Sequence, residues 1–146
     1  KNSPFLRLTA DNPLVDPYLI DNFIYYFKKI KIDYLTTRAM EHTNKWKIRS
    51  DFSKGISAEI FFSKKLFKNE KKFNLTNQQS PTWFFFNKLF SAKIKKFKSF
   101  GIYKKINLRK SFTIDNYSDY INVKKFIKKN NCKPGLNNIY EYYKNI

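Results

Sequence analysis

The sequence predicts an α+β domain with a mixed or antiparallel sheet, helices packed on one face and a long loop protruding between two strands. Three observations predict this class. Apolar residues alternate in some short segments, recur at helical spacing in others, and about fifteen polar and basic residues separate two strand-like segments. Because 146 residues suffice for a core, we expect residues 1–146 to form a single domain.

The first half of the chain contains the clearest patterns for secondary structure. Residues 5–9 alternate weakly and are interpreted as a first strand. Asp16 and Pro17 supply an N-cap and a proline at the first helical position of a helix over residues 17–31. The apolar residues at helical spacing are Leu19, Ile20, Phe23, Ile24, Phe27 and Ile30.

Two further strands enclose the protruding loop. Residues 34–38 form the second strand and residues 56–62 the third, in which alternate residues share one face. Residues 40–54 between them are called the finger. The residues that share the face of the third strand are Ile56, Ala58, Ile60 and Phe62.

The second half of the sequence predicts a loop, a strand or hairpin, and three helices, the last of them short. Residues 64–79 are polar and basic, and Ser80-Pro81 starts a helix that runs to about residue 97. Residues 102–114 contain two alternating pieces, typical of a strand or hairpin. A helix follows near residues 119–129, and a short one over 136–145 after Pro134-Gly135. The inward faces of the two longer helices are assigned to Phe86, Leu89, Phe90, Ile94 and Phe97, and to Tyr120, Val123, Phe126 and Ile127.

The net charge of the chain gives the clearest indication of its binding partners. Thirty Lys and Arg against eleven Asp and Glu give +19, which favours a polyanionic partner whose counterions are released on binding. Lys, Asn, Phe, Tyr and Ile are abundant beside three Gly and one Met. This composition indicates an A+T-rich genome such as a mitochondrial one, a bias that itself raises the lysine content.

Several classes of protein are disfavoured by what the sequence lacks. No run of 18 apolar residues predicts a transmembrane helix, and no signal peptide is visible. Cys132 is the only cysteine, so an internal disulfide and a multi-cysteine zinc site are excluded. The single histidine, His42, lies in the finger without a catalytic partner, and no glycine-rich phosphate loop occurs. We therefore expect neither an enzyme nor a cofactor or metal.

Basic residues in the finger and in two later segments form the predicted binding face. Lys and Arg neutralise phosphates, and an exposed aromatic ring stacks on an unpaired base. Trp46 either stacks in this way or packs against the base of the finger. The RNA-binding candidates are Arg38, Lys45, Lys47, Arg49, Lys54, Lys93, Lys95, Lys96, Lys98, Lys104, Lys105, Arg109 and Lys110.

At these residues the chain resembles the universal large-subunit ribosomal protein L-five family, which holds 5S rRNA in the central protuberance of the ribosome. Thr37-Arg38-Ala39, Trp46-Lys47-Ile48-Arg49 and Gly55 match the family's ordered central motifs. The segments 85–91 and 95–102 are similar to its aromatic helix and the basic segment that follows, and Pro4-Phe5-Leu6-Arg7-Leu8 is similar to its first strand.

The resemblance implies a structural constituent of a divergent mitochondrial ribosome, located in the matrix and encoded by the organelle. It implies that Lys93–Lys98 and the segment 103–110 anchor large-subunit rRNA, which could include 5S rRNA. It also implies that the finger contacts peptidyl-site tRNA and a small-subunit head protein, without any membrane partner. The finger residues assigned to this contact are His42, Asn44, Lys45, Ser50 and Phe52.

Two alternatives stay open at the level of the sequence. The first is another mitoribosomal or RNA-binding protein of similar composition. The second is a basic accessory subunit of a mitochondrial membrane complex, which would share the charge without binding RNA. Residue 1 is Lys rather than Met, so the sequence does not establish whether it is the true N-terminus.

Overall fold

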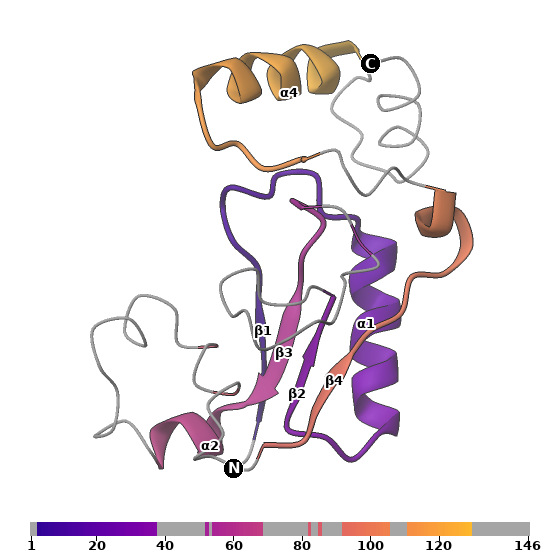
Figure 1. Cartoon of the computed structure of the whole chain (residues 1–146), viewed down its shortest axis with the longest axis vertical. Coiled ribbons are helices and arrows are strands. Elements are labelled where there is room, and N and C mark those ends of the chain that lie inside the picture. Colours follow the sequence, from indigo (N-terminus) through magenta and orange to yellow (C-terminus); the bar gives the residue numbers. More distant parts are fainter. Residues whose placement is uncertain are drawn as a thin grey trace, which may run out of the picture.

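The computed structural model describes residues 3–37, 52, 54–68, 82, 85, 92–105 and 111–129 (Figure 1). The predicted α+β class with a mixed sheet is confirmed. The elements in chain order are β1 (Pro4–Arg7), α1 (Pro17–Lys29), β2 (Tyr34–Thr36), β3 (Glu59–Phe62), α2 (Ser63–Phe67), β4 (Ile94–Lys96), the 3-10 helix η4 (Gly101–Lys105) and α4 (Tyr117–Lys129).

The strands of the described part form one sheet in the order β1-β3-β2-β4. β3 pairs antiparallel with both β1 and β2, whereas β4 joins β2 in parallel. The register sets Leu35 opposite Ile60 on one side and Lys95 on the other. β3 comes between β2 and β4 in the sequence and runs opposite to β2, so the chain returns before β4 begins in the direction of β2.

Helix α1 forms where the sequence predicted it. Asp16 is the N-cap, and its Oδ1 accepts a hydrogen bond of 2.9 Å from the amide of Tyr18. Leu19, Phe23 and Phe27 are buried at helical spacing against the sheet, and Lys28 and Lys29 end the helix, where cations suit its dipole. Figure 1 shows α1 lying alongside the sheet, with its axis running along the strands.

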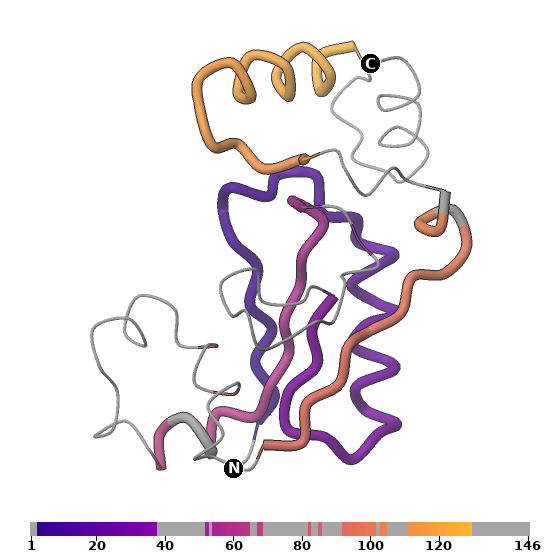
Figure 2. Tube along the Cα trace, viewed as in Figure 1, coloured from indigo at the N-terminus to yellow at the C-terminus, as the bar shows by residue number. Residues whose placement is uncertain are grey.

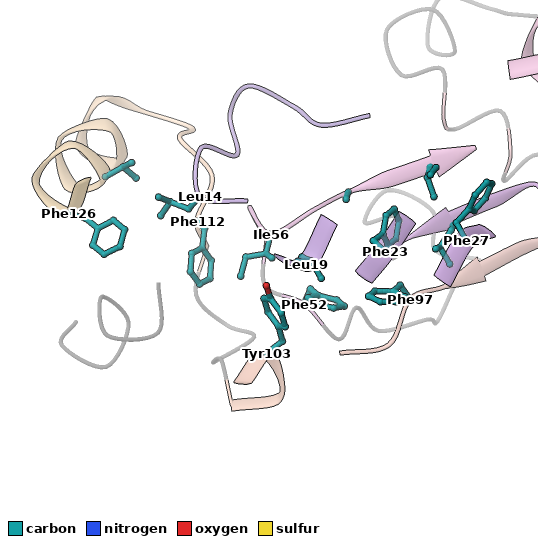
Figure 3. Close-up of a cluster of buried hydrophobic side chains, with 14 residues drawn as sticks. Leu14, Leu19, Phe23, Phe27, Phe52, Ile56, Phe97, Tyr103, Phe112 and Phe126 are labelled. Carbon is teal, nitrogen blue, oxygen red and sulfur yellow. The ribbon is translucent and has the colours of Figure 1, made fainter. Parts of the chain in front are cut away.

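The larger part of the core lies between α1 and one face of the sheet (Figure 3). Ile56, Ala58 and Ile60 are buried there and Phe62 packs against them, so the predicted face of the third strand is confirmed. Phe97 lies at the centre of this cluster, edge-on to Phe23 at 5.3 Å between ring centroids.

The opposite face of the sheet holds a second buried cluster, which the sequence did not predict. Tyr34 stacks on Phe85 at 4.9 Å between ring centroids, and Phe61 lies 5.3 Å from the same ring. Ala92 and Ile94 pack against this group. Because successive residues of a strand point to opposite faces, Tyr34 and Leu35 enter different clusters.

Residues 111–114 close the end of the sheet near α4. The amide of Phe112 donates to the carbonyl of Lys54 at 2.8 Å, and the amide of Ile114 donates to the carbonyl of Asp11 at 2.9 Å. Figure 2 shows this segment passing over the loop between β1 and α1 before the chain enters α4. Gly55 has a φ of +89°, and a Cβ there would lie 2.4 Å from the carbonyl carbon of Phe112. Only glycine allows this approach.

Three local predictions are wrong within the described residues. The helix expected up to residue 97 is the strand β4 at Ile94–Lys96, because β2 supplies hydrogen-bond partners there. The loop expected from residue 64 begins as α2, and the hairpin expected over 102–114 begins as the 3-10 helix η4. These segments have ambiguous periodicity, so their tertiary neighbours determine their structure.

The helix expected near residues 119–129 is confirmed as α4, with one inward residue misassigned. Val123 and Phe126 are buried and Ile127 packs against the core, but Tyr120 is 43% exposed. The predicted helix over 136–145 and most of the finger lie outside the described residues.

Candidate functional site

Four of the predicted binding lysines lie on β4 or within two residues of it, along an edge of the described sheet. Lys93, Lys95 and Lys98 are exposed, and Lys96 is half-buried. Lys95 and Lys96 point to opposite faces, because side chains alternate along a strand. We call these four residues the β4 lysine strip.

The start of β4 is joined to the end of α1 through Asp33. Its carboxylate Oδ2 accepts from the amide of Lys93 at 2.8 Å, and its own amide donates to the carbonyl of Lys93 at 2.9 Å. The exposed Lys31 lies two residues before Asp33. This connection brings the basic last turn of α1 to the end of the sheet where Lys93 precedes β4.

Two tyrosines of α1 lie beneath lysines of this region. The Nζ of Lys29 is 4.2 Å from the ring centroid of Tyr25, and the Nζ of Lys95 is 5.5 Å from that of Tyr26. Ammonium groups at these distances are attracted by the negative face of the ring. We call Tyr25, Tyr26, Lys29 and Lys95 the tyrosine–lysine surface.

This region is positively charged despite two nearby acids. Lys28, Lys29 and Lys31 are exposed beside the β4 lysine strip. Asp33 is half-buried and engaged with the backbone of Lys93, and Asp21 is exposed one turn before Tyr25. A chain of net charge +19 therefore presents a surface here that attracts phosphates.

The N-terminus of α1 does not offer a second anion site. A helix N-terminus attracts anions because its first amides lack partners. Here the buried carboxylate of Asp16 meets that need: Oδ1 accepts from the amide of Tyr18, and Oδ2 accepts from the hydroxyl of Tyr103 at 2.6 Å. The chain's own carboxylate occupies the position where a phosphate would bind.

Two buried tyrosines have raised pKa values and structural partners. Burial, followed by the hydrogen bond to Asp16 and its charge, raises the pKa of Tyr103 far above its ordinary value. Burial and the charge of Glu59 likewise raise the pKa of Tyr34, whose hydroxyl donates to Glu59 Oε1 at 2.5 Å. Arg7 binds the other oxygen of Glu59 at 2.5 Å. Both phenols are held neutral, which suits them as hydrogen-bond donors rather than as bases.

The structure changes the assignment of two predicted finger residues. Phe52, expected to contact tRNA and the small subunit, is buried. Its ring stacks on Phe97 at 6.2 Å between centroids and packs at a tilt against Tyr103 at 5.5 Å. Figure 3 shows its ring between theirs. Lys54, an RNA-binding candidate, forms an ion pair of 2.8 Å with Asp115. Both residues attach the base of the finger to the domain.

The remaining predicted residues divide into two groups. Lys104 is exposed on η4, and the backbone of Lys105 ends the same helix. The others lie outside the described residues: Arg38, His42, Asn44, Lys45, Lys47, Arg49, Ser50, Arg109 and Lys110.

Sequence reasoning missed the two tyrosines of this surface. Tyr25 and Tyr26 fall between the apolar positions of α1, so the periodicity that predicts the core face of the helix does not include them. A usable signal was present, because Tyr25 and Lys29 are four residues apart and therefore neighbours on a helix.

Metal-ligand clusters and membrane-spanning helices are both absent from the part of the chain that the structure describes. No group of three or more His, Cys, Asp or Glu side chains there is placed to hold a metal ion. None of the helices in the same part of the chain has the length and apolar character needed to cross a membrane.

Comparisons with known proteins bear on the family. Neither protein-family models nor curated proteins gave a match to this chain. A solved structure described as a cytidylyltransferase from Leptospira borgpetersenii serovar Hardjo-bovis, strain JB197, matches with a TM-score of 0.66 and 22% sequence identity. The match covers 86% of this chain but 49% of that protein, so the chain spans about half of its length.

This match overturns the family and function expected from the sequence. The predicted membership of the L-five ribosomal family is wrong, because the fold is shared with a cytidylyltransferase. The expectation of a non-enzymatic ribosomal constituent, with its ribosomal, mitochondrial and translational descriptions, is contradicted by the same finding. The RNA and protein partners and the mitochondrial location stay predictions from the sequence. The chain is similar in fold to a cytidylyltransferase.

Proposed function

We propose that this chain is a nucleotide-binding domain of the nucleotidyltransferase class. The observation that carries the proposal is the likeness in fold to a cytidylyltransferase over 86% of the chain. The β4 lysine strip and the lysines at the end of α1 support it, since they supply positive charge where a nucleotide's phosphates would bind.

The proposed ligand is a nucleoside triphosphate, with a cytidine nucleotide as the first candidate. A triphosphate carries several negative charges on a short chain, which suits lysines spaced along one strand. Lys93, Lys95 and Lys98 are exposed and in position to form charge-assisted hydrogen bonds to phosphate oxygens. In the reaction of this class, an acceptor oxygen forms a bond to the α-phosphorus and pyrophosphate leaves.

Calorimetric titration of the full chain with CTP, UTP, ATP and GTP tests the proposal. We expect saturable binding of CTP that weakens with added salt, and release of pyrophosphate once a suitable acceptor is supplied. Lys93→Gln and Lys95→Gln should each weaken binding about two- to fivefold, the range of an exposed ion pair.

The matched control is Lys124→Gln on α4, which removes the same charge from another helix. We expect its affinity for CTP to stay within about twofold of the unaltered chain. Absence of binding to all four triphosphates would overturn the proposal. Equal losses for Lys95→Gln and Lys124→Gln would reject the β4 lysine strip as the site.

A further inference from the structure

The outer face of α1 carries two highly exposed tyrosines in one line. Tyr18 is 61% exposed and Tyr25 is 60% exposed. With Asn22 and Lys29 they occupy positions i, i+4, i+7 and i+11, a single stripe along the helix. Asn22 itself donates to the carbonyl of Tyr18 at 2.8 Å. At 1.5 Å per residue the stripe is about 16 Å long.

Aromatic and cationic groups alternate where the stripe meets the sheet. The Nζ of Lys29 lies 4.2 Å from the ring centroid of Tyr25, and that of Lys95 lies 5.5 Å from that of Tyr26. Tyr26 is held from below by Phe97 at 5.3 Å between ring centroids. Tyr25 and Tyr26 therefore each have an ammonium group over the ring.

We propose that this face of α1, together with the tyrosine–lysine surface, binds single-stranded nucleic acid. Bases stack on Tyr18 and Tyr25, and the lysines contact the backbone phosphates. A strand rising about 3.4 Å per nucleotide places roughly five nucleotides along 16 Å. This function is additional to the proposed binding of a nucleoside triphosphate and does not depend on it.

Charge complementarity selects this partner over the other classes of macromolecule. Three lysines at the end of α1 (Lys28, Lys29 and Lys31) are exposed beside Lys93 and Lys95, and Asp21 is the sole acid of α1. A membrane surface fits less well, because interfacial helices insert their apolar face into lipid. The apolar face of α1 is already buried in the core.

Fluorescence anisotropy with a labelled oligouridylate of about 20 nucleotides tests the proposal on the full chain. We expect Tyr25→Leu to weaken binding about five- to a hundredfold, the range for loss of one stacked base. Tyr25→Phe should bind as the unaltered chain does, because the stacking ring is kept. A duplex of equal length should bind more weakly at the same salt concentration.

Two control variants separate stacking from general charge. Phe67→Leu removes a ring that is 65% exposed on α2, away from α1, and should leave affinity within about twofold. Lys29→Gln should weaken binding, because it removes an ammonium group beside Tyr25, whereas its charge control Lys124→Gln on α4 should leave affinity within about twofold. The proposal would be overturned if Tyr25→Leu bound oligouridylate as tightly as the unaltered chain does. It would also be overturned if polyglutamate competed for binding as well as unlabelled oligouridylate does. If the chain bound oligouridylate but not CTP, the proposed binding of a nucleoside triphosphate would be rejected and the binding of single-stranded nucleic acid would stand.

Discussion

At the scale of single residues, positions that look similar in sequence have different roles. Phe52 and Phe67 are both phenylalanines in polar surroundings, yet Phe52 is buried among Phe97 and Tyr103 and Phe67 is 65% exposed. Gly55 and Gly101 both have positive φ, but only Gly55 lies against another segment. Neighbours distant in sequence decide how much each residue contributes to stability.

Phe52 is expected to stabilise the fold rather than contact a partner. Phe52→Ala should lower the free energy of unfolding by about 3–5 kcal/mol, the usual cost of removing a buried aromatic ring. Phe67→Ala, its exposed counterpart, should change it by less than about 0.5 kcal/mol. Urea denaturation measures both values. A small loss for Phe52→Ala would restore the possibility that its ring is available to a partner.

Gly55 is expected to tolerate no side chain. Gly55→Ala adds a Cβ that would lie 2.4 Å from the carbonyl carbon of Phe112, at a φ of +89°. The clash and the backbone strain together should cost about 2–5 kcal/mol.

Gly101→Ala is the matched control, because its φ is +53° and nothing lies within 4 Å of its added Cβ. It should cost about 1–2 kcal/mol from backbone strain alone. Thermal denaturation of both variants gives the difference, and equal costs would contradict the close packing of residues 54–55 on Phe112.

At the scale of elements, Asp16 joins the start of α1 to η4. Its carboxylate caps α1 through the amide of Tyr18 and accepts the hydroxyl of Tyr103, 87 positions away. The local part of this arrangement is visible in the sequence as Asp16-Pro17, because a cap acts on residues two or three positions away. The distant part is not, because no local pattern identifies Tyr103 as its partner.

The Asp16–Tyr103 pair should produce a loss of stability at high pH. Burial and Asp16 raise the pKa of Tyr103 above its ordinary value near 10, so the folded chain keeps its proton where the unfolded chain loses it. The contribution of the Tyr103 proton to the free energy of unfolding is complete below about pH 10. It falls as pH rises further, by up to about 1.4 kcal/mol per pH unit.

Tyr103→Phe removes the titrating group, so its unfolding free energy should fall less steeply above about pH 10. At neutral pH the same variant should lose about 1–3 kcal/mol, because a buried hydrogen bond to a carboxylate is gone. Urea denaturation between about pH 7 and 11 measures both effects. Parallel pH profiles for the two proteins would contradict the raised pKa.

At the scale of the whole molecule, net charge opposes folding and favours a polyanionic ligand. A charge of +19 on 146 residues creates self-repulsion that the fold must overcome. The lysines at the end of α1, together with Lys93 and Lys95, concentrate part of that charge near the start of β4. The proposed binding of nucleoside triphosphate and of single-stranded nucleic acid would relieve this repulsion.

Salt should therefore stabilise the chain when no ligand is present. Raising ionic strength from about 0.01 to 0.15 M shortens the screening length from about 30 to 8 Å and weakens the repulsion between lysines. We expect Tm to rise over this range in differential scanning calorimetry, while affinity for oligouridylate falls. A Tm that does not change with salt would indicate that the charges are already compensated in the folded state.

The sequence by itself determined the α+β class, the helix α1 with its Asp16 cap, the helix α4 and the buried face of residues 56–62. Capping and periodicity involve residues within a turn or two, so they can be read locally. Only the tertiary structure decided that residues 94–96 form a strand, that Phe52 is buried and that Tyr26 lies under Lys95. Strand pairing and burial depend on partners far away in the chain, and local pattern carries no information about them.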